Sequence, residues 1–149
     1  MRLAVYQPDI APNLGAILRI CACFGVSLDV IEPCGFAVSD KTLRRAAMDY
    51  TAQADFTRHD SWQNFITHAR PPRLILLTTK VKTGLWDFDF HPGDTLMMGR
   101  ESAGVPQDVH DACDAHVTIP MPGGGRSLNV AVAAGIALAE AMRQLRAQS

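Results

Sequence analysis

The stretch MPGGGRSLNVAVAAGIALAEA, from Met121 to Ala141, decides how the rest of the chain is interpreted. Its three consecutive glycines indicate a bent loop whose backbone is approached closely by another group. Between Val130 and Ala141 almost every residue is apolar and most are small, which indicates a helix that packs tightly against its neighbours. We therefore predict a helix from about Ser127 to the carboxyl end, with the polar groups of a binding site at its amino-terminal end.

The remainder of the chain alternates between strand-like and helix-like patterns. Short apolar runs bounded by turn residues indicate buried strands, and apolar residues spaced three and four apart indicate helices. We predict strands over residues 2–6, 27–33, 55–59, 73–79, 95–100 and 115–121. We predict further helices over residues 14–25 with Asn13 as the N-cap, 39–50, 60–69 with Asp60 or Ser61 as the cap, and 106–113. This alternation predicts one α/β domain over residues 1–149, with a mainly parallel sheet flanked by helices.

Three loops follow predicted strands, and all three are expected at the same edge of the sheet. They are TTK after Leu77, GRESAGVP after Met98 and MPGGGRSLN after Ile119. Functional loops of parallel sheets lie at the carboxyl ends of the strands. We therefore expect these loops to form one pocket.

The net charge, the apolar runs and the cysteine spacing limit which functions and cellular locations we expect. The net charge of −1 and the pI of about 6.5 exclude attraction of nucleic acid by total charge, although a local basic patch remains possible. No signal peptide and no apolar run of membrane-spanning length is present, so we expect a soluble cytoplasmic protein without a membrane partner. The cysteines have no metal-binding spacing, and we expect no metal and small buried thiols in a reducing compartment: Cys21, Cys23, Cys34 and Cys113.

The loop residues themselves leave several functions open. The segment GGGRS lacks the Gly-Lys-Ser/Thr ending of a P-loop, and the spacing of a dinucleotide-binding fingerprint is missing. A bent glycine loop instead suits recognition of a planar base by backbone groups. Glu101 beside a tight turn needs a partner, which could be Arg19, Arg126 or a backbone amide. Arg19 lies among apolar residues, so it either extends to the surface or is held for a function.

Three motifs occur in order along the chain: N-x-G-x-x-x-R over residues 13–19, G-x-E-x-x-G-[IVL]-P over 99–106, and I-P-M with S-L-N over 119–129. Together they resemble the motifs of the SPOUT superfamily of RNA ribose 2′-O-methyltransferases. The segments LRRAAMDY and LTTK are similar to the branch that methylates cytidine or uridine 34 of tRNA. The resemblance covers essentially the whole chain, with no separate RNA-binding domain.

This resemblance implies a fold with a deep trefoil knot at the carboxyl end, although general folding rules disfavour knots. It also implies S-adenosylmethionine as the cofactor and a homodimer as the active assembly. The glycine-rich segment would belong to the knot that wraps the cofactor, and the small residues of the last helix would pack against the knot and the partner subunit. The implied cofactor-binding residues are Leu77, Gly99, Ile119, Met121, Ser127 and Leu128.

The resemblance also implies roles in catalysis. It places Arg19 at the 2′-hydroxyl of the ribose. A guanidinium is almost never deprotonated, so we expect Arg19 to stabilise the developing alkoxide while an RNA phosphate or water takes the proton. Glu101 beside Arg19 would hold the guanidinium in place. The residues expected to orient Arg19, the ribose or the cofactor are Asn13, Glu101, Ser127 and Asn129.

The expected partner is the anticodon stem-loop of tRNA, with methylation of the ribose at wobble nucleotide 34. Plausible phosphate contacts are Arg44, Arg45, Lys80 and Arg126. Relatives often carry a tyrosine in the last helix where Ala139 stands here, so any role of that tyrosine is lost or replaced. Three alternatives remain: a 2′-O-methyltransferase acting on another tRNA position or on rRNA, a non-catalytic RNA-binding dimer, and a nucleotide-binding α/β protein of another class.

Overall fold

The computed structural model describes residues 1–46 and 55–147. Its central feature is a sheet of six parallel strands in the order β3-β2-β1-β5-β4-β6. The elements, in chain order, are β1 (Arg2–Tyr6), α1 (Ala11–Phe24), β2 (Ser27–Ile31), α2 (Asp40–Ala46), β3 (Phe56–His59), α3 (Trp62–Ala69), β4 (Leu74–Leu77), the 3₁₀ helix η2 (Leu85–Asp87), β5 (Thr95–Met98), α4 (Gln107–Asp111), β6 (Ala115–Val117) and α5 (Val130–Ala147). The predicted α/β fold with a mainly parallel sheet is therefore confirmed.

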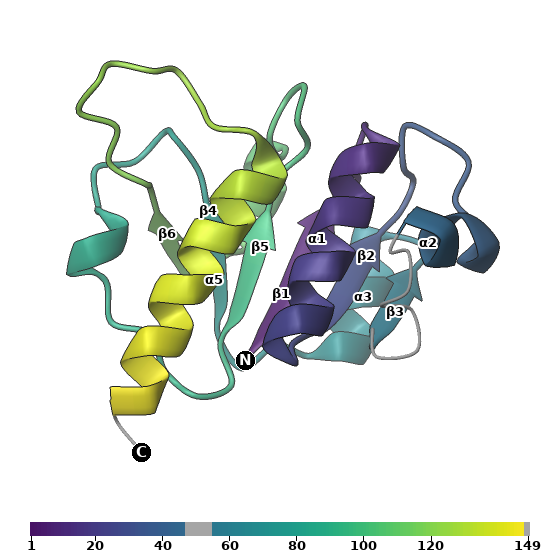
Figure 1. Ribbon diagram of the computed structural model, residues 1–149, viewed down its shortest axis with the longest axis horizontal. Helices are drawn as coiled ribbons and strands as arrows, with labels where there is room; N and C mark the ends of the chain where they lie inside the picture. Colours follow the sequence, from purple (N-terminus) through teal and green to yellow (C-terminus); the bar gives the residue numbers. More distant parts are fainter. Residues whose placement is uncertain (47–54, 148–149) are drawn as a thin grey trace.

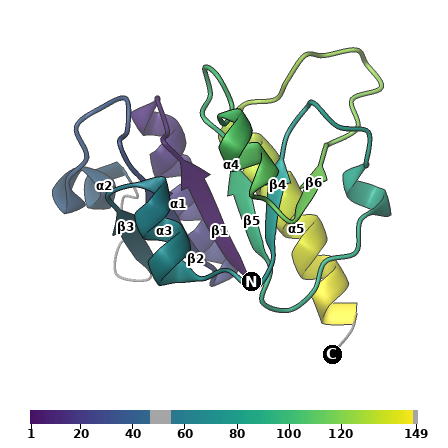
Figure 2. The same ribbon diagram turned by 180° about the vertical axis from the view of Figure 1, so that it is seen from behind.

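Helices cover both faces of the sheet, which explains why the strands are apolar runs rather than alternating patterns. Figure 1 shows α1, α2 and α5 on one face, and Figure 2 shows α3 and α4 on the other. The larger core lies under α1 and α5 and includes Leu14, Ile17 and Leu138, each fully buried. The smaller core is built around Phe65 of α3.

Strand order reverses between β1 and β5. The chain proceeds from β1 outward through β2 to β3, and then crosses to the other side of β1 to form β4 and β5. At such a switch point the loops that leave neighbouring strands diverge and open a crevice at the carboxyl ends of the strands. The loops after β1, β4, β5 and β6 all lie at this edge, which is uppermost in Figure 1.

Helix α1 begins earlier than its sequence pattern predicts. Ile10 is the N-cap, Pro12 lies in the first turn, and Asn13 is inside the helix, so the predicted N-cap role of Asn13 is wrong. Proline has no backbone N–H, and the first turn of a helix needs none there. Pro12 rather than Asn13 is therefore the residue that marks the start of α1. The predicted end is confirmed, because Gly25 adopts a left-handed conformation with φ of 66° and closes the helix.

Other boundaries also differ from prediction. The strand predicted over residues 115–121 ends at Val117, and Thr118 forms a single parallel bridge with Gly84. Pro120 has no backbone N–H, so it cannot continue the ladder. The cap of α3 is confirmed as Ser61, whose hydroxyl accepts a hydrogen bond from the Asn64 N–H at 3.0 Å. The predicted helix over 39–50 is described to Ala46, and the rest of that prediction lies outside the described residues.

The four cysteines differ in how far they are buried. Burial raises the pKa of the Cys21 and Cys113 thiols to about 12, so both behave as inert core residues. Cys34 is half-buried, and burial raises its pKa to about 11. Cys23 is exposed, contrary to prediction, because two residues along a helix turn the side chain by about 200°. Within the described residues no helix is long and apolar enough to cross a membrane.

Candidate active site

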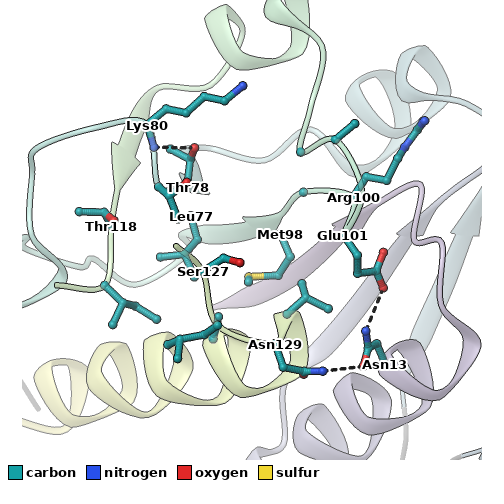
Figure 3. A pocket seen from close by; sticks show the side chains of 18 of the residues that line it. Asn13, Leu77, Thr78, Lys80, Met98, Arg100, Glu101, Thr118, Ser127 and Asn129 are labelled. Carbon is teal, nitrogen blue, oxygen red and sulfur yellow. Dashed lines mark hydrogen bonds between the residues drawn. The ribbon is translucent and has the colours of Figure 1, made fainter. Parts of the chain in front are cut away.

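A pocket of about 470 Å³ opens at the carboxyl ends of β4, β5 and β6, against the first turns of α1 and α5 (Figure 3). The three motif loops meet there, as the sequence predicts. All six residues predicted to bind the cofactor belong to its lining: Leu77, Gly99, Ile119, Met121, Ser127 and Leu128.

The part of the pocket lining that follows β5 is a tight turn that contains two glycines, Gly99 and Gly104. Arg100 and Gly104 pair through two backbone hydrogen bonds of 2.8 and 3.0 Å, which close a tight turn. Gly104 has φ of +64°, a conformation that favours glycine. A Cβ on Gly99 would lie 3.0 Å from the Gly104 Cα, so no larger residue fits at this position without movement of the backbone. The two glycines of this motif therefore shape the pocket.

A chain of hydrogen bonds links the three motifs across one side of the pocket (Figure 3). Asn129 Nδ2 donates to Asn13 Oδ1 at 3.0 Å, and Asn13 Nδ2 donates to Glu101 Oε1 at 3.3 Å. Glu101 Oε2 accepts the backbone N–H of Asp9 at 2.7 Å. The two carboxylate oxygens of Glu101 accept these hydrogen bonds, so Glu101 fixes the orientation of the Asn13 side-chain amide and of the Asp9 backbone amide.

The loop after β1 also binds the loop after β5 in the opposite direction. Ser102 donates to Asp9 Oδ2 from its backbone N–H at 3.1 Å and from its hydroxyl at 2.5 Å. Chiefly because of the hydroxyl, the pKa of the Asp9 carboxyl lies below its usual value. The two loops are thus held together by a reciprocal pair of backbone-to-carboxylate contacts.

Asn129 has a second role that the sequence pattern did not reveal. Its Oδ1 accepts hydrogen bonds from the backbone N–H groups of Ala131 at 2.9 Å and Val132 at 3.3 Å, as a helix N-cap does. Helix α5 consequently begins at Val130, so the predicted start at Ser127 is wrong. Ser127 and Leu128 remain in the loop, where they can line the pocket.

The catalytic residues expected from sequence are not all in the pocket. Asn13, Glu101, Ser127 and Asn129 line it, whereas Arg19 lies six residues beyond Asn13 on α1, with an exposed side chain that is not part of the lining. The hydrogen-bond partners of Glu101 are the Asp9 amide and Asn13, so a backbone amide, one of the three partners foreseen for it, is present.

The expected RNA contacts are spread over the molecule. Lys80 lines the pocket, and its backbone N–H donates to Thr78 Oγ1 at 3.3 Å. Arg126 is exposed on the glycine-rich loop, and Arg45 is exposed on α2. Arg44 also belongs to α2.

Several lining residues were not assigned a role from the sequence, although Thr78 and Arg100 lie on loops that were expected to form the pocket: Ile10, Thr78, Met98, Arg100, Thr118 and Ala133. Thr78 and Thr118 directly follow β4 and β6, so their place after a strand was a usable signal. Arg100 lies in the motif G-x-E-x-x-G-[IVL]-P, but at a position where the motif allows any residue, so the motif gave no reason to select it. No cluster of potential metal ligands occurs among residues 1–46 and 55–147.

Comparison with known proteins gives this pocket a context. The SpoU rRNA Methylase family profile matches residues 1–139. The chain belongs to the SpoU methylase family. A SpoU methylase relative from Beijerinckia indica, named tRNA (cytidine(34)-2′-O)-methyltransferase, is 54% identical over 149 residues, covering 97% of this chain and 92% of the relative.

Solved structures of similar proteins have the same fold. One, described as giving structural insights into the 2-OH methylation of C/U34 on tRNA, matches with a TM-score of 0.89 and 39% identity, covering 98% of this chain and 96% of the other. The SpoU methyltransferase AviRb from Streptomyces viridochromogenes, in complex with the cofactor AdoMet, matches with a TM-score of 0.86 and 28% identity. That match covers 100% of this chain and 61% of the other.

Proposed function

We propose that this protein transfers the methyl group of S-adenosylmethionine to the 2′-oxygen of wobble nucleotide 34, a cytidine or a modified uridine, of tRNA. The observation that carries the proposal is the meeting of three motif loops in one pocket, in a chain that matches methyltransferases of this specificity along nearly its whole length.

The lining fits S-adenosylmethionine in its chemistry. The volume of about 470 Å³ lies within the range of cofactor pockets. Apolar side chains of Leu77, Ile119 and Leu128 suit the faces of a purine, and the Thr78 and Ser127 hydroxyls suit polar groups. The missing side chain at Gly99 leaves room for the backbone of Gly104, so the tight turn after β5 can form at the edge of the pocket. We assign cofactor binding to Leu77, Gly99, Ile119, Met121, Ser127 and Leu128. When bound, the cofactor supplies an electrophilic methyl group on a positively charged sulfur.

The protein residues have to align a poor nucleophile and stabilise the negative charge on its oxygen as the proton leaves. We assign the second task to Arg19. Its guanidinium stays protonated, so an RNA phosphate or water accepts the proton. Arg19 lies about 9 Å along α1 from Asn13, outside the pocket lining, so in this proposal it meets the ribose as the RNA covers the mouth of the pocket. Glu101, Asn13 and Asn129 hold the two helix starts and the β5 loop in register around the ribose.

The assembly is also part of the proposal. We propose that residues 1–149 form one catalytic domain, that its carboxyl end is knotted, and that two copies form a homodimer. The segment leading into the glycine-rich loop supports the knot, because Thr118 is hydrogen-bonded to Thr83 and Leu85 of a separate passage of the chain. An exposed apolar side chain in the first turn of α5, outside the pocket lining, supports a subunit interface: Val132 is 51% exposed.

The substrate is expected to be the anticodon stem-loop, which places the protein in the cytoplasm with tRNA. The phosphate backbone of the RNA would be held by Lys80 at the pocket and by three further basic residues outside it: Arg44, Arg45 and Arg126. Because the net charge of one chain is −1, the basic surface has to be assembled locally, for example across two subunits.

The deciding experiment is methyl transfer from labelled S-adenosylmethionine to bulk tRNA from a strain that lacks this gene, with nuclease mapping of the product. A 2′-O-methyl group at nucleotide 34 is the expected result. Label at another tRNA position or only in rRNA would assign a different substrate. Cofactor binding without transfer to any RNA would support the non-catalytic RNA-binding alternative.

A further inference from the structure

Among the described residues, the pocket is lined by two basic side chains, Lys80 and Arg100, and no role has yet been assigned to Arg100. It follows β5 directly. Its backbone N–H and carbonyl are both bonded to Gly104, at 3.0 and 2.8 Å, so the origin of its side chain is fixed. Figure 3 shows this side chain across the pocket from Leu77 and Thr118, directed away from both.

The guanidinium of Arg100 has no carboxylate partner within residues 1–46 and 55–147. Arg2, Arg58 and Arg73 each form an ion pair at 2.8 Å or less, but Arg100 forms none among the described residues. Its Nε is buried and has no hydrogen-bond acceptor in the same part of the chain. The guanidinium carbon instead lies 5.9 Å from the centre of the Tyr6 ring, which holds it by a cation–π contact.

The nearby carboxylates are hydrogen-bonded to other groups, although the positive charge of Arg100 contributes to the lowered pKa of Asp9. Asp9 accepts two hydrogen bonds from Ser102, and Glu101 accepts from the Asp9 amide and from Asn13. Arg100 as a whole is only half-buried, so an anionic oxygen from outside the chain can approach its charged end and offset the cost of the unpaired N–H. The planar guanidinium matches the geometry of a phosphate in particular.

We propose that Arg100 binds a backbone phosphate of the RNA next to the ribose that is methylated. This inference rests on the proposed function. The cofactor carboxylate is the other anion in reach of the pocket, but the side chain of Arg100 is directed away from the wall formed by Leu77 and Thr118. Arg100 is thus a substrate-positioning residue that holds the strand while the ribose enters.

The first test compares Arg100→Gln and Arg100→Lys with a matched control, Arg146→Ala, which removes an exposed charge at the far end of α5. We expect Arg100→Gln to weaken binding of an unmodified anticodon stem-loop by about ten- to a hundredfold. The slope of the logarithm of the association constant against the logarithm of the salt concentration is negative, and it should become less steep by about 0.7 to 0.9, as expected for one lost phosphate contact. Arg100→Lys should restore the slope and part of the affinity.

Cofactor affinity, measured by calorimetry with S-adenosylmethionine, should be unchanged in Arg100→Gln. A large loss there would assign the guanidinium to the cofactor and overturn the proposal. Equal RNA binding by Arg100→Gln and Arg146→Ala would overturn it as well. If the wild-type protein methylates nucleotide 34 in these assays, such a result refutes only the role of Arg100; if it methylates no tRNA, the proposed function itself fails.

The second test replaces single phosphates on either side of nucleotide 34 by neutral methylphosphonates. One replacement should weaken binding to the wild-type protein but cause no further loss with Arg100→Gln, because that contact is already gone. Additive losses at both phosphates would show that Arg100 touches neither, which would contradict the proposal.

Discussion

Asn129 combines two functions in one amide. Its oxygen caps α5 while its nitrogen donates to Asn13, so the start of the last helix and the polar side of the pocket depend on the same side chain. Aspartate caps helices as well as asparagine does but has no N–H to donate.

The two functions can be separated by substitution. We expect Asn129→Asp to keep the free energy of unfolding within about 0.5 kcal/mol of wild type, whereas Asn129→Ala loses about 1 kcal/mol with the cap. Both should lower kcat/KM, because in both the donor to Asn13 is lost. Urea denaturation and methyl-transfer kinetics provide the two measurements. Full activity in Asn129→Asp would contradict a role for this contact in the site.

Substitution of Arg19 tests its role in methyl transfer separately from folding and cofactor binding. Because its side chain is exposed and outside the pocket lining, Arg19→Ala should leave stability and cofactor affinity nearly unchanged while methyl transfer falls by about a hundredfold or more. Single-turnover kinetics and calorimetry measure the two effects. Equal losses of transfer and of cofactor binding would show that the assigned role is wrong, and Arg19→Lys tests whether charge alone suffices.

Two glycines of the pocket loops differ in the space around them. A Cβ at Gly99 would meet the backbone of Gly104 at 3.0 Å, and that backbone is pinned by its bonds to Arg100. A Cβ at Gly125 would meet only Met121 Sδ, at 3.9 Å.

We therefore expect Gly99→Ala to lose about 1–3 kcal/mol of stability and much of the cofactor affinity, because the tight turn after β5 must shift. Gly125→Ala, in the glycine-rich loop, should stay within about 0.5 kcal/mol of wild type. Thermal unfolding with and without S-adenosylmethionine compares them. A larger effect at Gly125 would mean that the backbone of this loop has to move during binding.

The contact between Asp9 and Ser102 joins the loops after β1 and β5, and it makes a prediction about pH. The pKa of Asp9 is lowered in the fold, so its contribution to stability is present above the unfolded pKa and disappears as pH falls through the folded pKa. Ser102→Ala should raise the pKa of Asp9 toward its usual value, measured by NMR titration of the carboxyl carbon. The stabilities of the two proteins should differ at neutral pH and converge in acid. An unchanged pKa would show that the hydroxyl does not hold this carboxylate.

The molecule as a whole depends on α5, because this helix closes the main core over the sheet. Its second half buries Ala137, Leu138 and Ala141, and Gln144 bonds to the backbone of the segment before β5 at Phe88 and Phe90.

Deletion of residues 137–149 should therefore give misfolded protein, whereas deletion of residues 147–149 should be tolerated. Circular dichroism and sedimentation velocity distinguish the outcomes. A soluble, folded monomer from the longer deletion would contradict both the packing argument and the proposed dimer.

Local sequence determined the alternation of strands and helices, because strand-length apolar runs and helical spacing are properties of neighbouring residues. It also determined the end of α1 at Gly25 and the cap of α3 at Ser61, which depend on single turns. The three loops were correctly assigned to one pocket because parallel strands bring their carboxyl ends to one edge.

Only the tertiary structure decided which partners the polar side chains chose. Asn13 followed the rule for a helix cap in sequence but bonds to Glu101 and Asn129, which lie 88 and 116 residues away. Arg100 lies at a motif position without a fixed residue type, and only the structure shows that it lines the pocket with its guanidinium over the ring of Tyr6. Such contacts form between segments distant in the chain, and no local pattern encodes them, because each depends on where the sheet brings the two segments together.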